Sequence, residues 1–249
     1  MKHVVAIIPA RGGSKGIPNK NLVPFCGKPL VAWSIKQIRA ARGVGSVWVT
    51  SDSDAILQVA VEHGARAIRR PESISGDTAS SESAWLHALD EIEKLGPPVD
   101  LVVAAQATSP LREALDVERA LEAFETQGYD SLFSGAELED FFIWQQDRER
   151  GLVSLNYDSK KRERRQDVAK QFVENGSFYV FKPWVLRELN NRLGGKIGVS
   201  PMAFWKTFEI DSLESLEMCE ALMRHYLVDQ PQHSVSGRDP SWHPTASST

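Results

Sequence analysis

The chain has 249 residues, of which 42% are hydrophobic and 25% charged, a composition typical of a globular protein with a sizeable core. Its net charge of −4 and pI of about 5.9 give no overall basic field, which argues against nucleic acid or an anionic membrane as a partner. The 2 cysteines are too few for a disulfide framework or a zinc site, and no apolar run approaches the roughly 18 to 20 residues that span a bilayer. We therefore expect a cytoplasmic protein with no signal peptide.

The first half of the chain alternates between two hydrophobic patterns. Continuous, β-branched apolar runs predict buried strands, and apolar residues three or four positions apart predict helices between them. The predicted strands are Val4–Ile8, Val47–Thr50, Ala65–Arg69, Leu101–Ala105 and Asp130–Ser134. The predicted helices are Leu30–Ala41, Asp54–His63, Ser80–Lys94 and Asp116–Gln127. This alternation predicts an α/β fold with right-handed crossovers and a mostly parallel, Rossmann-like sheet flanked by helices.

After Gly135 the rhythm changes, and we interpret residues 137–180 as a small antiparallel insertion that leaves the sheet. Its predicted strands are Phe141–Gln146, Gly151–Asn156 and Gln171–Phe181. The alternation then resumes with helices at Val185–Arg192 and Leu213–Tyr226 and strands at Ile197–Ser200 and Thr207–Ile210. We expect one domain over residues 1–228, followed by a flexible tail over residues 229–249, where Pro, Ser, His and Gly dominate.

The stretch IIPARGGSKGIPNKN, from Ile7 to Asn21, is too long and too cationic to be only a turn. It follows the first strand, at the carboxyl edge of a parallel sheet, where such sheets bind ligands. Its three glycines can adopt positive φ and let backbone N–H groups approach a ligand, while Arg11, Lys15 and Lys20 add positive charge. Backbone donors combined with cations predict a polyphosphate site. The alternative is a glycine-rich surface loop with solvated charges.

The common phosphate-loop motifs are absent from this stretch, since neither G-x-x-x-x-G-K-[ST] nor G-x-G-x-x-G occurs in it. The letters Gly12 to Gly16 do match G-x-S-x-G, the nucleophile elbow of serine hydrolases. An elbow serine sits directly at a strand end and has earlier strands to supply its oxyanion loop. Only one strand precedes Ser14, so we reject that interpretation.

Four stretches in the same order resemble the CMP-sialic acid synthetases, the acylneuraminate cytidylyltransferases. They are IIPARGGSKGIPNKN, RRPESISGDTASSES, QATSPLR and RRQDVAKQFVENGSFYVF, and the similarity covers roughly residues 3–226. The resemblance implies a nucleotidyltransferase fold and a homodimer built partly by the inserted segment. It also implies a Mg²⁺-dependent reaction in which CTP and a sialic-acid-like nonulosonic acid give the CMP-sugar and pyrophosphate.

The resemblance also assigns residues that would hold the nucleotide. Arg11, Lys15 and Lys20 would hold the phosphates, with Ser14 in the same loop. The residues implied at the ribose and the cytosine are Asn21, Arg70 and Ser81.

A second group of residues would serve the sugar and the metal. Gln106 and Thr108 would face the sugar, and Arg165 and Gln166 would contact it from the insertion, which the resemblance places at the dimer interface. Asp211 would bind Mg²⁺.

Four positions depart from the family pattern. Ala107 stands where the family has proline, Glu174 where the bacterial family often has arginine, and Val168 where the animal-type motif has tryptophan. The usual I-D-x-D pair has become Glu209-Ile210-Asp211. These departures leave the prediction for the nucleotide half of the reaction unchanged, and they leave the identity of the sugar open.

Glu209 and Asp211 alternate along a predicted strand, so their carboxylates would share one face. Two carboxylates combined with substrate phosphates form a donor set that Mg²⁺ commonly takes. The alternative is that Asp211 only begins the following helix.

Several alternatives remain open at this level. The basic run around Arg165 could be a solvated surface, and Asp77 and Ser80 could only cap a helix. The acid could be an eight-carbon Kdo-type sugar or a phosphonate, or the chain could bind nucleotide without catalysis.

Overall fold

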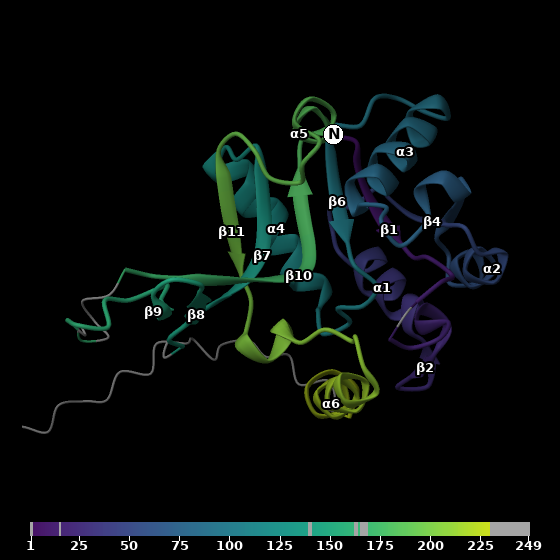
Figure 1. Ribbon diagram of the computed structural model, residues 1–249. Coiled ribbons are helices and arrows are strands. Elements are labelled where there is room, and N and C mark those ends of the chain that lie inside the picture. The colour runs from purple at the N-terminus through teal and green to yellow at the C-terminus, as the bar shows by residue number, and fades with distance from the viewer. Residues whose placement is uncertain (1, 15, 139–140, 162–163, 165–168, 230–249) are drawn as a thin grey trace, which may run out of the picture.

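The computed structural model describes residues 2–14, 16–138, 141–161, 164 and 169–229. Its centre is a seven-stranded sheet with the order β11-β7-β10-β6-β1-β4-β5 (Figure 1). Strand β1 (Val4–Pro9) pairs in parallel with β4 (Ser46–Ser51) and β6 (Leu101–Ala105), and β4 pairs in parallel with β5 (Arg66–Arg69). The predicted mostly parallel α/β sheet is therefore confirmed.

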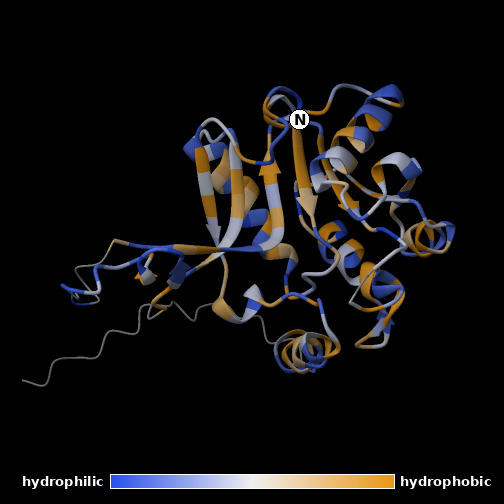
Figure 2. Ribbon diagram, in the orientation of Figure 1, coloured by the Kyte–Doolittle hydropathy of each residue, from blue (hydrophilic) through white to orange (hydrophobic). Residues whose placement is uncertain are grey.

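The two faces of the sheet are covered by different helices because successive strand side chains point to opposite sides. Val4, Ala6 and Ile8 of β1 lie in one apolar cluster with helices α1 (Leu30–Arg39), α2 (Asp54–Glu62) and α4 (Ala114–Gln127). Val5 and Ile7 lie in the other with α3 (Ser81–Lys94) and α5 (Pro183–Leu189). Figure 2 shows the hydrophobic residues along β6 and β10 in the middle of the sheet. Two layers of helices thus bury strands that are apolar on both faces.

One expectation about the inserted segment is wrong. Strand β10 (Phe172–Phe181) does not remain in the excursion but returns to the centre of the sheet, antiparallel to β6 and to β7 (Ser131–Glu137). Its second half, from Phe178 to Phe181, consists of large, mostly apolar side chains that are buried, which explains why it takes a central place. Strand β11 (Ile197–Pro201) completes that edge, parallel to β7.

Among the described residues of the excursion, β8 (Trp144–Asp147) and β9 (Gly151–Ser154) form a separate hairpin. Figure 1 shows this hairpin projecting away from the central sheet. The short strands β2 (Pro24–Phe25) and β3 (Lys28–Pro29) form another small antiparallel pair that the hydrophobic pattern does not predict.

The segment after β11 also differs from the prediction. Residues Thr207–Ile210 are not a strand, because a 3₁₀ turn occupies Phe204–Thr207 and the chain then bonds to a loop instead of a sheet edge. The turn is anchored by Lys206, which is 4% exposed and donates to Asp116 at 2.6 Å and to Glu113 at 2.7 Å. Helix α6 (Leu213–Met223) follows and continues into a π-helical turn over Arg224–Val228.

Among the described residues, no helix combines the length and the apolar character that crossing a bilayer requires.

Candidate active site

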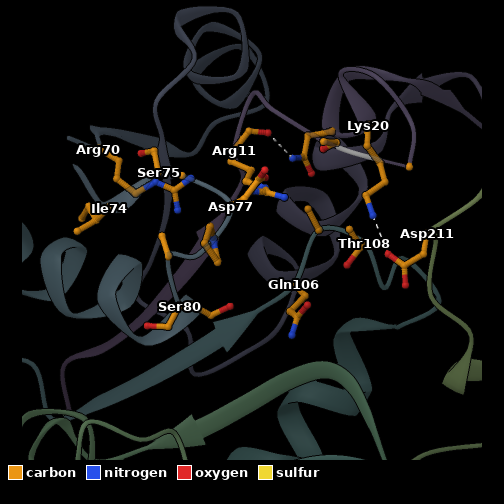
Figure 3. A pocket seen from close by; sticks show the side chains of 18 residues that line it. Arg11, Lys20, Arg70, Ile74, Ser75, Asp77, Ser80, Gln106, Thr108 and Asp211 are labelled. Carbon is orange, nitrogen blue, oxygen red and sulfur yellow. Dashed lines mark hydrogen bonds and ion pairs between the residues drawn. The ribbon is translucent and has the colours of Figure 1, made fainter. Parts of the chain in front are cut away.

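A cavity of about 380 Å³ opens at the carboxyl edge of the sheet, where the loops after β1, β5 and β6 meet. It is lined by nine of the predicted site residues: Arg11, Ser14, Lys20, Asn21, Arg70, Ser81, Gln106, Thr108 and Asp211. In Figure 3, Arg70 and Ser75 lie at one end, Lys20 and Asp211 at the other, and Arg11 and Asp77 between them. Residues separated by up to two hundred positions therefore converge because parallel strands end at the same edge.

Four predicted residues lie elsewhere or cannot be placed. Glu209 is half-buried beside the cavity and does not line it. Lys15, Arg165 and Gln166 lie outside the described residues.

The loop after β1 is held in place by two hydrogen bonds. Asn21, 5% exposed, donates its amide N–H to the Arg11 carbonyl at 3.0 Å, and the Gly12 N–H donates to Asp52 at 2.9 Å. The expectation of positive φ at the glycines is wrong, since Gly12, Gly13 and Gly16 do not have it and Asn19 does, at 52°. Gly16 is instead required by a close approach: a Cβ there would lie 2.2 Å from the Asp211 carbonyl oxygen.

Two basic residues of this loop form ion pairs across the cavity. Arg11 Nη1 lies 2.8 Å from Asp77 Oδ1, and Lys20 Nζ lies 2.8 Å from Asp211 Oδ1. Lys20 also donates to the Ile210 carbonyl at 2.6 Å. Both acids are more exposed than their basic partners, with side-chain exposures of 52% for Asp77 and 75% for Asp211. Pairs of this kind are weak, so an incoming anion can replace the carboxylates.

The guanidinium of Arg70 lies deeper. Only 6% of its surface is exposed, and its Nη2 lies 3.7 Å from Asp52 Oδ1. Burial lowers the pKa of Arg70, and the nearby positive charge of Arg11 lowers it further, while Asp52 acts in the opposite direction. Its Nε and Nη2 are buried donors without a hydrogen-bond partner in the described part of the chain. A buried, incompletely satisfied guanidinium in a cavity wall is suited to binding an acceptor-rich ligand.

The loop after β6 carries the uncharged part of the site. Gln106 and Thr108 line the cavity, and the Thr108 carbonyl accepts a hydrogen bond from the Ile210 N–H at 2.9 Å. This bond ties the β6 loop to the acidic segment that contains Glu209 and Asp211. Figure 3 shows Gln106 and Thr108 on the same side of the cavity as Asp211.

Glu209 and Asp211 do not lie on a strand, and they flank Ile210, whose N–H bonds to this loop. Burial raises the pKa of the Glu209 carboxyl and the negative charge of Asp211 raises it further, whereas Ser109, Lys20 and Arg112 lower it. Glu209 lies against Gly176, where a Cβ would be 2.0 Å from its Oε1. No group of three or more metal-ligating side chains occurs within the described ranges. Of this pair only Asp211 lines the cavity, and one or two carboxylates fit Mg²⁺ when a nucleotide supplies further oxygens.

The sequence interpretation missed or only partly recognised other residues of the site. Ser80 does cap α3, since its Oγ accepts from the Ser83 N–H at 3.1 Å, but it also lines the cavity. Asp77 lines the cavity as the partner of Arg11. Asp52 holds the Gly12 amide, and its position directly after a predicted strand was the signal that could have identified it.

Comparisons with known proteins agree with this geometry. A family model described as "Cytidylyltransferase" matches residues 5–232. The chain belongs to the cytidylyltransferase family.

Among curated relatives, an N-acylneuraminate cytidylyltransferase of Oncorhynchus mykiss is 40% identical over 72% of this chain and 41% of its own length. A pseudaminic acid cytidylyltransferase of Campylobacter jejuni is 31% identical over 90% of this chain and 97% of its own length. The chain thus spans less than half of the fish relative but nearly all of the bacterial one.

The solved structure of CMP:2-keto-3-deoxy-manno-octonic acid synthetase in complex with CTP has a TM-score of 0.69 with this chain. It is 20% identical and covers 91% of this chain and 100% of its own. At that identity the comparison supports the fold alone.

Proposed function

We propose that this cytidylyltransferase-family protein couples CTP to a sialic-acid-like nonulosonic acid and releases pyrophosphate. The observation that carries the proposal is the cavity itself, which Arg11, Lys20 and Arg70 line together with the carboxylates of Asp77 and Asp211 at the carboxyl edge of the sheet. The named relatives act on N-acylneuraminate and pseudaminic acid according to their names, which supports an acid of this class.

In the proposed reaction the anomeric hydroxyl of the acid attacks the α-phosphorus of CTP. The bond between the α-phosphorus and the oxygen that bridges to the β-phosphate breaks, pyrophosphate leaves with that oxygen, and the proton of the hydroxyl is released to solvent. Enzymes assist such transfers mainly by positioning the reactants and stabilising charge. Arg11 and Lys20 stabilise the phosphates, and Arg70 binds the base together with Ser81. Asn21 orients the part of the loop that faces the ribose. Gln106 and Thr108 position the acid on the far side of the α-phosphate.

Mg²⁺ is the cofactor that fits the site. Asp211, with Glu209 beside it, would hold the ion, and the nucleotide would supply the remaining oxygens. When bound, Mg²⁺ neutralises phosphate charge and orients the triphosphate. Lys20, which pairs with Asp211 at 2.8 Å, would be free to contact a phosphate oxygen if Asp211 held the ion.

A homodimer is the second element of the proposal. The hairpin and its flanks expose large apolar side chains, with relative exposures of 52% for Phe141, 46% for Trp144 and 63% for Leu152. Phe141 stacks on Phe204 with ring centroids 5.0 Å apart, so the patch continues onto the body of the protein. Exposed apolar patches of this kind mark interaction sites, and a second copy of the chain is the partner we propose. At micromolar concentration, light scattering should give the mass of a dimer for the unmodified protein and the mass of a monomer for Leu152→Glu. The same mass for both proteins would contradict the proposal.

The decisive experiment is a coupled pyrophosphate-release assay with CTP, Mg²⁺ and a panel of acids. We expect turnover with nonulosonic acids, little with an eight-carbon Kdo-type acid or a phosphonate, and little with ATP, GTP or UTP. Turnover of a phosphonate or a Kdo-type acid alone would overturn the substrate class. CTP binding without turnover of any acid would indicate a non-catalytic nucleotide-binding protein.

A further inference from the structure

Arg112 is a fully buried cation for which the proposed reaction has no use. Its relative exposure is 0%, and no carboxylate within the described ranges lies in ion-pair distance of it. Burial lowers its pKa to about 10, partly offset by the negative charges of Asp116 and Glu209, so the guanidinium remains charged at neutral pH. Burying a charge without a close counter-ion is costly, which calls for a specific role.

Within the described part of the chain, its side-chain hydrogen bonds go to the loop after β6 and to Ser34 of α1. The Nη2 atom donates to the Gln106 carbonyl, to the Ser109 carbonyl at 2.6 Å and to the hydroxyl of Ser34 at 3.2 Å. The guanidinium therefore links the two ends of the segment 106–109. Because hydrogen bonds that involve a charged group are stronger than neutral ones, this bridge fixes the loop more firmly than backbone contacts alone.

The same segment connects to the rest of the site through two backbone bonds. The Gln106 N–H donates to the Ser177 carbonyl at 3.1 Å, and the Thr108 carbonyl accepts from the Ile210 N–H at 2.9 Å. Ile210 in turn accepts from Lys20 and lies between the two carboxylates. A shift of the loop would therefore move the side chains of Gln106 and Thr108 and also the acidic segment.

We propose that Arg112 is a positioning residue that holds the 106–109 loop, and through it Ile210, in the geometry that orients the acid substrate. The nucleotide side of the cavity makes no contact with the guanidinium among the interactions that the described residues show. Loss of the guanidinium should consequently impair the use of the acid much more than the binding of CTP. This inference rests on the proposed function for its kinetic part only.

The first test is independent of turnover. Hydrogen exchange of the Gln106 and Ile210 amides should be about tenfold faster or more in Arg112→Met, because the loop opens locally, while amides of β1 and β4 change by less than about twofold. Arg112→Lys retains the charge on a shorter side chain. Its exchange rates at these two amides should lie between those of the unmodified protein and those of Arg112→Met. It also carries the test if Arg112→Met does not fold. Unchanged exchange at both amides, or an equal change across the whole sheet, would overturn the proposal.

Gln37→Met is the matched control. Gln37 is 9% exposed and donates to the Pro110 carbonyl at 2.8 Å, which does not line the cavity. The Gln37→Met variant removes a buried donor to the Pro110 carbonyl, which directly follows the segment 106–109. The variant should therefore reduce stability without accelerating amide exchange at Gln106 and Ile210.

The second test separates the two substrates. In Arg112→Met we expect KM for the acid to rise or kcat to fall by about tenfold to a hundredfold, since small misplacements have effects of that size, while Kd for CTP measured calorimetrically stays within about twofold. Equal losses for CTP and the acid would indicate a merely structural role and overturn the inference. If the unmodified protein turned over no acid, the proposed function would fail, and the exchange experiment would still decide the role of Arg112.

Discussion

The two sides of the cavity are built in opposite ways. On the proposed nucleotide side, Arg11 and Lys20 lie on a long loop and pair with exposed carboxylates. On the side proposed for the acid, Gln106 and Thr108 are uncharged and lie on a short loop to which the buried Arg112 donates hydrogen bonds. Groups that must exchange partners during a reaction are held by weak surface pairs, whereas groups that define position are held by buried bonds.

The largest effect should come from the carboxylate opposite the basic loop. Asp211→Asn removes a charge from the proposed ion site and should lower kcat by about a hundredfold to a thousandfold, in line with the loss of other preorganised charges. The midpoint of a Mg²⁺ titration should also move to higher concentration. Glu217→Gln, an exposed acid on α6, is the control and should retain activity. Near-native kcat in Asp211→Asn would remove Asp211 from the proposed site.

Arg11→Met tests the exchangeable side directly. Losing a guanidinium that stabilises the leaving pyrophosphate should lower kcat by about a hundredfold. The thermal midpoint should change little, since exposed ion pairs contribute about 0.2–1 kcal/mol. Arg69→Met removes a neighbouring surface arginine that does not line the cavity and should be silent. A large fall in Tm with normal kcat would assign Arg11 to structure.

Gly176→Ala tests the buried side. Gly176 has φ of 63°, and an added Cβ would lie 2.0 Å from Glu209 Oε1, so the carboxylate has to move. We expect a loss of about 1–2 kcal/mol in unfolding free energy from the backbone strain, together with reduced activity from the displaced Glu209. Gly151→Ala is a matched control, with φ of 74° and open space around its added Cβ. Equal activity in both variants would show that the position of Glu209 does not matter.

The smallest effect should follow from relieving a competing ion pair. Asp77→Asn removes the carboxylate that Arg11 contacts at 2.8 Å, which should free the guanidinium for a phosphate. Because such pairs contribute at most about 1 kcal/mol, Kd for CTP should fall by about two- to fivefold. Weaker CTP binding, measured by calorimetry, would show that Asp77 orders the cavity and does not compete with the ligand.

The sequence was sufficient for those elements whose hydrophobic pattern matches a single secondary structure. The apolar run Val4–Ile8 and the apolar periodicity of Ser80–Lys94 gave β1 and α3 within a residue or two. The same patterns failed at Thr207–Ile210, where the buried Lys206 and its two acids impose a turn, and at β10, whose apolar half enters the main sheet. Neither outcome can be read from periodicity, because each depends on a partner more than 60 residues away.

The candidate site divides in the same way. By itself, the order of residues determined which chemistry is present: a basic glycine loop after the first strand, a polar loop after β6 and an acidic pair before the last helix. Only the tertiary structure decided that Asp77 and Asp211 pair with the basic loop, that Glu209 lies against Gly176, and that Arg112 is buried beneath Gln106. The reason is physical: side-chain identity is encoded locally, whereas burial and partner choice arise when the carboxyl ends of the strands are brought to one edge.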